Sequence, residues 1–169
     1  SRPQRAKVWE VLAEYQRNLA ALGKMEWLDV IAQTRLYLAQ KGQILPYRAV
    51  VVDETQDLHP EELRLLRQLV PEGPDDLFFV GDAHQRIYGR PVVLSHCGID
   101  IRGRSSKLRI NYRTTEQIRD WAVSVLSDQP VDDMDGGLDD RLGYRSLLHG
   151  APPIIRQFDT QADEQAFLA

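Results

Sequence analysis

Apolar positions in the first part of the chain recur with the period of a helix. Between residues 5 and 22 an apolar side chain returns every third or fourth position, which places these side chains on one helical face. The same spacing resumes at Trp27 and ends near Gly42. We therefore expect two amphipathic helices that act as packing elements.

Two later runs are apolar without interruption and then stop at carboxylate and amide groups. The first is VVV followed by DETQD, at residues 50–57, and the second is FFV followed by GDAHQRIY, at residues 78–88. Such runs are typical of parallel strands that are buried on both faces. Ligands of open α/β sheets bind at the carboxyl edge of the strands, so the polar residues after each run form a candidate site. We expect the strands at residues 48–53 and 77–80.

A helix is expected between these two strands. Pro60 suits a first helical turn, and Glu61 and Glu62 suit its positive end. The side chains expected to face inward are Leu63, Leu66, Leu69 and Val70. The helix should end before Pro71.

After residue 100 the pattern predicts a third strand and a further helix. The strand is expected at residues 107–110, with Asn111, Tyr112 and Arg113 at its end. Thr114 and Gln117 have the spacing of a capping box. The helix that follows is expected to bury Ile118, Trp121, Ala122, Val125 and Leu126.

The last part of the chain changes character. Residues 127–153 have little periodicity, many acids and several glycines, which is typical of a long surface connection. Residues 154–158 resemble one more strand, and residues 163–169 begin another helix.

Length and composition place the chain among ordinary soluble proteins. It has 169 residues, 43% hydrophobic and 27% charged, which is enough for one domain with a sizeable core. No run is long enough to span a membrane, so no membrane partner is expected. Cys97 is the single cysteine, so no intrachain disulfide can form, and we expect a cytoplasmic location.

Charge is distributed unevenly along the chain, which bears on the expected partner. The net charge is −4, but the segment from Arg86 to Arg119 has eight basic and two acidic residues, which leaves −10 on the remainder. Basic charge beside a candidate nucleotide edge favours a phosphate or nucleic-acid surface. The alternative is that these basic residues form a solvent-exposed surface that binds no partner.

The residues at the expected sheet edge suit nucleotide hydrolysis. Asp53 could bind Mg²⁺, which takes one or two protein carboxylates beside phosphates, and Glu54 could activate a water. Taken alone, such a pair of acids could equally serve a structural purpose such as a helix cap. Gln85 and Asp82 follow the second strand, and Arg113, which could stabilise charge on a phosphate, follows the third.

These three segments, in this order, resemble motifs II, III and IV of the UvrD/Rep-type superfamily 1 DNA helicases. The motifs read DETQD, VGDAHQRIY and LRINYRT, and together they extend over about residues 49–115. Residues 25–30 also resemble the segment ahead of motif II, and residues 154–169 resemble the entry into the second motor domain. The chain is thus expected to be a fragment of such a helicase.

The resemblance implies a role for each motif residue. Asp53 would coordinate Mg²⁺, Glu54 would be the catalytic base that activates water toward ATP, and Gln85 would sense the γ-phosphate. Cofactor-binding positions would be Asp53, Gln56, Asp57, Asp82, Gln85, Tyr112 and Arg113, with Gln56 and Asp57 coupling the site to neighbouring motifs. Arg113 would contact the γ-phosphate, and Tyr112 would stack on adenine. Tyr88 and Arg90 would lie toward single-stranded DNA, where stacking contributes ~1–3 kcal/mol per base.

The sequence departs from the family pattern in two places. Many members continue motif III with a tryptophan that stacks on DNA bases, whereas this chain continues with Gly89-Arg90-Pro91. The phosphate-binding pattern Gly-x-x-x-x-Gly-Lys-Ser/Thr is also absent, because Gly23-Lys24 is followed by Met25. The family carries that loop upstream, and the arginine of its last motif downstream, of the residues present here. Without the loop, ATP affinity should be very weak and the fragment inactive.

The sequence therefore predicts a partial RecA-like (P-loop NTPase) α/β domain with a parallel sheet flanked by helices, lacking the phosphate-loop strand. Residues 1–128 would belong to the first motor domain, residues 129–153 to a surface connection and residues 154–169 to the start of the second. In such folds the strands of motifs II and III are parallel neighbours, so we expect that pairing here.

Three functions are consistent with this sequence. The parent protein could hydrolyse ATP, move 3′ to 5′ on single-stranded DNA and unwind duplex DNA, with the phosphate-loop segment and the second motor domain as its missing parts. It could instead be a degenerate motor half that binds DNA or a partner without hydrolysis. A metal-dependent nuclease that uses Asp53, Glu54 and Asp82 is a third possibility.

Overall fold

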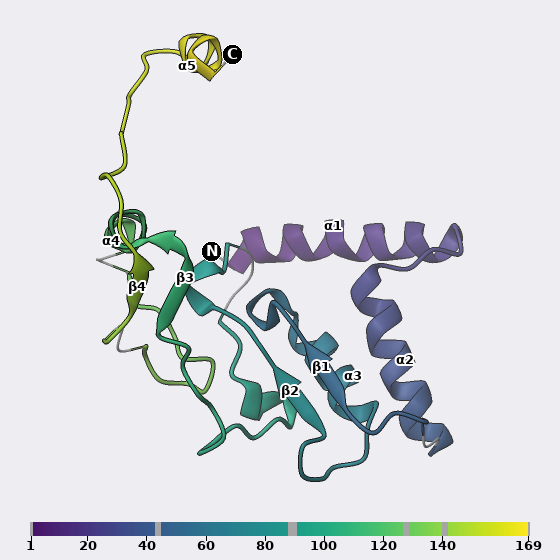
Figure 1. The fold of residues 1–169 in the computed structure, drawn as a ribbon. Coiled ribbons are helices and arrows are strands. Elements are labelled where there is room, and N and C mark those ends of the chain that lie inside the picture. Colours follow the sequence, from purple (N-terminus) through teal and green to yellow (C-terminus); the bar gives the residue numbers. More distant parts are fainter. Residues whose placement is uncertain (1, 43–44, 88–90, 127–128, 140–141, 169) are drawn as a thin grey trace. The chain divides into compact units, whose positions relative to one another are not determined.

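The computed structural model describes residues 2–42, 45–87, 91–126, 129–139 and 142–168 (Figure 1). In chain order its helices and strands are α1 (Arg2–Ala21), α2 (Trp27–Lys41), β1 (Val50–Val52), α3 (Pro60–Gln68), β2 (Leu77–Phe79), β3 (Ile110–Thr115), α4 (Glu116–Val125), β4 (Arg145–Leu148) and α5 (Gln161–Leu168). Three 3-10 turns complete the list: η1 (Thr55–Asp57), η2 (Ala83–Gln85) and η3 (Leu94–Cys97). The predicted α/β class is confirmed.

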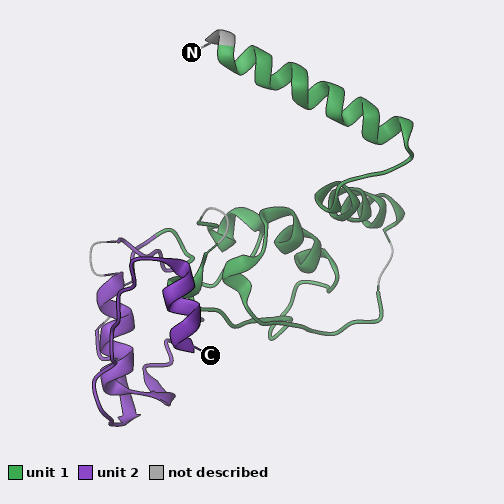
Figure 2. Cartoon of the chain, turned by 90° about the horizontal axis from the view of Figure 1, so that it is seen from above, with its two compact units in different colours: residues 1–102, 134–136 green, residues 103–133, 137–169 purple. Residues whose placement is uncertain are grey.

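The chain forms two compact units (Figure 2). The first contains residues 1–102 and 134–136, and the second contains residues 103–133 and 137–169. The division into motor-domain parts at residues 128 and 153 concerns the family's domains and stays a prediction.

Both predicted N-terminal helices are present in the first unit. The second ends as expected, because Gly42 takes the left-handed conformation (φ 57°) that commonly terminates a helix. Its partner is α3: Trp27 Nε1 donates to Glu62 Oε1 at 3.2 Å, and Arg35 pairs with Glu61 at 3.1 Å. The packing role predicted for the first helix is not seen in the described residues, since Val8 and Leu22 of its apolar face are 68% and 67% exposed. None of the described helices is long and apolar enough to cross a bilayer.

The predicted pairing of the two apolar strands is confirmed. Strands β1 and β2 are parallel, with Val50 opposite Leu77 and Val52 opposite Phe79. Helix α3 connects them, and it begins as predicted at Pro60. His59 caps it: the Nδ1 of His59 accepts the N–H of Glu61, while the Glu62 carboxylate accepts the N–H of His59.

The core of the first unit lies on one side of this sheet. Its buried members are Leu63, Leu94, Cys97 and Ile99, and Leu77 and Phe79 of β2 pack against them. Leu63 is the innermost residue, with no exposed surface. Burial also raises the pKa of the Cys97 thiol, with smaller effects from Arg64 and Glu61.

The expectation that both sheet faces are buried is wrong for the described residues. Val51 of β1 and Phe78 of β2, which are register partners, are 75% and 63% exposed. Alternate strand residues point to opposite faces. The described helix and turns that form the core cover only the face that carries Leu77 and Phe79, so the opposite face remains open.

The second unit corrects several expectations. The third strand covers Ile110–Thr115 instead of residues 107–110, because it pairs in parallel with β4, a strand inside the expected surface connection. Residues 151–158 form neither helix nor strand, so the strand expected at residues 154–158 is wrong. The C-terminal helix is confirmed as α5.

Helix α4 also differs from its prediction. Its N-cap is Thr115, whose hydroxyl accepts the N–H of Ile118, so the cap lies one residue after the predicted Thr114. Ile118, Trp121 and Val125 are 43%, 44% and 66% exposed. The apolar face of α4, expected to be buried, is largely open in the described chain.

Candidate functional site

The carboxyl ends of β1 and β2 lie side by side, and they position the first group of candidate residues. The ladder continues past the strands: the N–H of Val80 donates to the carbonyl of Val52 at 2.8 Å, and the N–H of Thr55 donates to the carbonyl of Val80 at 3.0 Å. The hydroxyl of Thr55 donates to the same Val80 carbonyl at 2.8 Å. These bonds hold residues 54–56 against residues 80–82.

Gln56 connects the two segments with one buried side chain. It is 4% exposed. Its Nε2 donates to Glu54 Oε2 at 2.7 Å, and its Oε1 accepts the N–H of Asp82 at 3.0 Å. The Gln56 carbonyl also accepts from Arg86 Nε at 3.2 Å. A buried amide with both ends bonded fixes the position of both segments.

Gly81 makes this close approach possible. A Cβ at Gly81 would lie 2.8 Å from Gln56 Oε1 and 3.2 Å from the backbone nitrogen of Thr55. Both distances are too short for an ordinary Cβ contact. Glycine is therefore required here by the neighbouring segment and not by its own backbone conformation.

The hydrogen bonds continue from Asp82 to Gln85. Gln85 Nε2, on turn η2, donates to Asp82 Oδ2 at 2.9 Å. A continuous series of bonds thus runs from Glu54 through Gln56 and Asp82 to Gln85. The structure brings these four predicted residues together.

Asp53 and Glu54 lie at the exposed end of this series. Glu54 has a left-handed backbone (φ 52°, ψ 40°), which is uncommon for a residue other than glycine, and Asp53 Oδ1 accepts its N–H at 2.9 Å. Asp57 on η1 is also exposed. Strained backbone of this kind is concentrated at functional sites.

The donor set around Asp53 fits a metal held mainly by phosphates and water. In the part of the chain that the structure describes, no three acidic, histidine or cysteine side chains form a metal-binding cluster. Mg²⁺ is commonly bound by one or two carboxylates together with substrate phosphates, so a single exposed carboxylate such as Asp53 is sufficient.

Tyr112 and Arg113 belong to the second unit, on β3 and not beyond the end of a strand as expected. Asn111 shapes this segment: its Oδ1 accepts the N–H of Arg113 at 2.7 Å and that of Thr114 at 3.2 Å. The Tyr112 ring is 70% exposed. Because the two residues lie in a different unit from Glu54, their convergence with the first group stays a prediction. Tyr88 and Arg90, predicted to contact DNA, lie outside the described residues.

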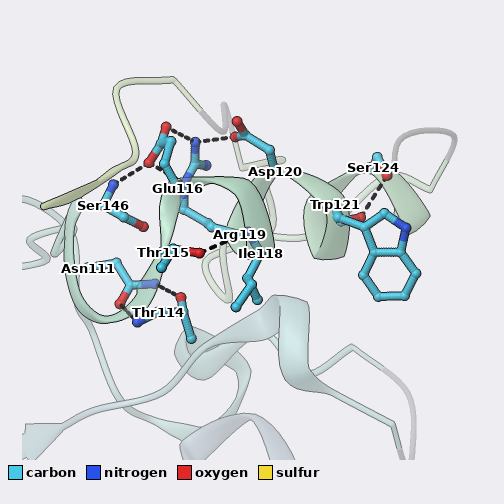
Figure 3. A network of polar contacts seen from close by, with 10 residues as sticks. All are labelled: Asn111, Thr114, Thr115, Glu116, Ile118, Arg119, Asp120, Trp121, Ser124 and Ser146. Atoms are coloured by element: carbon cyan, nitrogen blue, oxygen red, sulfur yellow. Dashed lines mark hydrogen bonds and ion pairs between the residues drawn. The ribbon is translucent and has the colours of Figure 1, made fainter. Parts of the chain in front are cut away.

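A polar network at the start of α4 holds β3, α4 and β4 together (Figure 3). Glu116 accepts from Arg119 at 2.6 Å and from the backbone N–H of Ser146, and Arg119 also pairs with Asp120 at 2.5 Å. The Arg119 hydrogen bond, followed by that of Ser146, lowers the pKa of Glu116 to about 2. The carboxylate is therefore charged at neutral pH and ties the helix to β4.

Several important residues were not predicted from the sequence. Gly81 and the bridging contacts of Gln56 depend on how two distant segments pack, and no local signal indicates them. Glu116 and Arg119 have the i, i+3 spacing of a helical ion pair, which could have been recognised. His84, inside motif III, has no role in the sequence-based prediction.

Comparison with known proteins places this geometry in a family. The model of the UvrD/REP helicase N-terminal domain matches residues 1–90. The chain belongs to this family. The matched region includes the segments that carry Glu54, Gln56, Asp82 and Gln85, and it ends before β3.

Individual relatives are consistent with this assignment. The chain is 34% identical to the ATP-dependent DNA helicase UvrD1 of Mycobacterium tuberculosis (strain ATCC 25618 / H37Rv), over 71% of this chain and 18% of the relative. It is 35% identical to UvrD1 of Mycobacterium leprae, over 69% and 18%. It is 28% identical to the mitochondrial ATP-dependent DNA helicase HMI1 of Saccharomyces cerevisiae, over 72% and 18%. The chain thus spans less than one fifth of the length of these relatives.

Proposed function

We propose that the chain is part of an ATP-dependent DNA helicase motor. ATP hydrolysis would be coupled to 3′–5′ movement on single-stranded DNA and to duplex unwinding. Residues 49–115 would supply motifs II, III and IV of a RecA-like motor. Membership of the UvrD/REP family and the printed names of the relatives support this proposal.

The observation that carries the proposal is the series of hydrogen bonds from Glu54 to Gln85. A motor must connect the group that activates water with the group that senses the terminal phosphate. Gln56 makes this connection through two bonds, of 2.7 Å to Glu54 and 3.0 Å to the N–H of Asp82. If Gln85 moves when phosphate is released, the displacement would be transmitted to Glu54 through Asp82 and Gln56.

In this proposal each residue has a defined task. Glu54 is the general base, which accepts a proton from the attacking water, and Asp53 holds the metal. A bound Mg²⁺ would neutralise charge on the phosphates. Gln85 contacts the γ-phosphate, and Asp57 and Asp82 support the site around it.

The second unit and the loop after η2 supply the remaining contacts. Arg113 would stabilise negative charge on the γ-phosphate, and Tyr112 would stack on adenine. Tyr88 and Arg90 would contact the DNA strand. These 169 residues contain no Gly-x-x-x-x-Gly-Lys-Ser/Thr pattern. We therefore propose that they form only part of the ATP site and do not hydrolyse ATP by themselves.

The decisive experiment is Glu54→Gln in the full-length protein. The amide keeps the size of the side chain but cannot accept the proton, and general-base catalysis typically contributes about 10²–10⁴-fold. We expect DNA-stimulated ATP turnover to fall by at least about 100-fold, whereas the Kd for ATP stays within about twofold. Turnover would be measured by phosphate release and binding by a fluorescent ATP analogue.

Glu72→Gln is the matched control. Glu72 is an exposed glutamate in the loop before β2, outside the candidate site. Its substitution should leave both turnover and binding unchanged. Ordinary turnover in Glu54→Gln would contradict the assigned role, and a wild-type protein that binds DNA without hydrolysing ATP would contradict the proposal as a whole.

A further inference from the structure

His84 lies on η2 between Asp82 and Gln85, and its ring faces the Asp82 carboxylate. Its Nδ1 is 3.1 Å from Asp82 Oδ1. The side chain of His84 is 20% exposed and that of Asp82 is 46% exposed. No task in the proposed mechanism uses this imidazole.

The chemistry of this contact determines the position of one proton. An ionised carboxylate only accepts hydrogen bonds, so the imidazole nitrogen that faces it must be a donor. Nδ1 therefore carries a proton whether the ring is neutral or charged. When the ring is neutral, Nε2 is the unprotonated nitrogen.

The second oxygen of the same carboxylate holds the predicted phosphate sensor. Asp82 Oδ2 accepts from Gln85 Nε2 at 2.9 Å, while the backbone N–H of Asp82 is held by Gln56 at 3.0 Å. The carboxylate is thus fixed on one side by His84 and on the other by Gln85. If the carboxylate rotates, the Gln85 amide loses its partner or rotates with it.

We infer that His84 is a positioning residue, which orients the amide of Gln85 through the carboxylate of Asp82. The inference rests on the proposed function, because it assigns Gln85 the task of contacting the γ-phosphate. The role depends on the hydrogen bond between His84 Nδ1 and Asp82 Oδ1.

A purely structural role of Asp82 can be separated from this one. Asp82 Oδ1 also accepts the backbone N–H of His84 at 3.0 Å, which caps the 3-10 turn. Every residue other than proline retains that N–H at position 84. Substitution of His84 by alanine or glutamine therefore removes the contact at Nδ1 and leaves the cap in place.

The test is steady-state ATP hydrolysis by the full-length protein with saturating single-stranded DNA. His84→Asn keeps an amide donor near the position of Nδ1, whereas His84→Gln places its amide near the position of Nε2. His84→Ala removes the donor altogether. We expect Ala and Gln to lower kcat roughly 3- to 10-fold with KM for ATP within about twofold, and Asn to restore at least about half of the wild-type kcat.

A double-mutant cycle with Gln85→Ala tests whether His84 affects kcat through Gln85. If His84 acts through Gln85, then His84→Ala should not lower kcat further once Gln85 is removed. His96→Ala, at an exposed histidine of the same unit, is the matched control and should match the wild type. If His84→Ala does not fold, His84→Gln enters the cycle in its place.

The outcomes separate the inference from the proposed function. Wild-type kcat in His84→Ala and His84→Gln, equal losses in all three variants, or independent losses in the cycle would each overturn the positioning role alone. A wild-type protein without ATP turnover would overturn the proposed function and this inference with it.

Discussion

At the scale of single residues, the Glu116 carboxylate has the largest pKa shift among the described acids of the second unit. Its side chain is 23% exposed and lies against the Arg119 guanidinium, which lowers its pKa to about 2 from an ordinary value of 4.5. A carboxylate with a lowered pKa stabilises the folded state fully above the pKa of the unfolded chain. That contribution is lost as the pH falls from about 4.5 toward about 2.

We predict that Arg119→Gln raises the pKa of Glu116 toward 4.5, because it removes the main hydrogen-bond donor. The backbone N–H of Ser146 should keep the pKa somewhat below that value. The measurement is an NMR titration of the side-chain carboxyl carbon. Arg145→Gln, at an exposed arginine on β4, is the control and should leave the pKa near 2.

Among the predicted site residues, those that follow an apolar strand lie where the sequence places them. Asp53 and Glu54 follow β1, and Asp82 and Gln85 follow β2. Their catalytic and binding roles stay a prediction. The bridging contacts of Gln56 were not predictable in the same way. They depend on the register of β1 against β2, which brings together segments 26 residues apart in sequence.

At the scale of elements, the contact between η1 and the end of β2 depends on the absence of a side chain at position 81. Gly81→Ala would place a Cβ 2.8 Å from Gln56 Oε1, so either the Gln56 side chain or the backbone must move. We predict a loss of about 1–3 kcal/mol in the free energy of unfolding, in the range of other overpacking substitutions.

Chemical denaturation would measure that loss, with Gly73→Ala as the control. A Cβ at Gly73 meets nothing within 4 Å, so this substitution should change stability by less than about 0.5 kcal/mol. If the two substitutions cost the same, the packing of Gln56 on Gly81 does not stabilise the fold.

Elements with strong local signals were predicted well, and those that depend on partners were not. Helix α3 begins at Pro60 and α2 ends before Gly42, because proline and glycine act on their own backbone. Strand β3 begins three residues later than the sequence predicts, and β4 lies where the sequence predicts a surface connection. The extent of both strands is set by their mutual pairing and by an irregularity between Asn111 and Thr115.

At the scale of the whole molecule, one face of the sheet in the first unit is left uncovered by the described residues of that unit. Val51 and Phe78 are paired in register and are 75% and 63% exposed. Parallel sheets are ordinarily covered on both faces, and a two-stranded sheet leaves unpaired strand edges. Such a surface favours association.

We therefore predict that the 169-residue chain associates as its concentration rises. Replacing Val51 and Phe78 together by threonine should reduce the association, because threonine retains strand propensity but is less apolar. Sedimentation velocity over a range of concentrations would detect the change. Val8→Thr with Trp9→Thr, which alters apolar residues that are 68% and 70% exposed on α1, is the control and should have the smaller effect.

The sequence by itself determined the α/β class, the positions of the main helices, the parallel pairing of β1 with β2 and the presence of carboxylates and amides at one sheet edge. The class, the helices and the polar sheet edge follow from local periodicity and turn residues, which are properties of neighbouring residues. The pairing of β1 with β2 is implied by the resemblance of the two motifs to those of the UvrD/Rep-type helicases. Only the tertiary structure decided that Gln56 connects Glu54 to Asp82, that Gly81 must lack a side chain and that His84 faces Asp82. Each of these depends on distances that arise when the chain folds, and hydrogen bonds form only within a few tenths of an ångström of their preferred length.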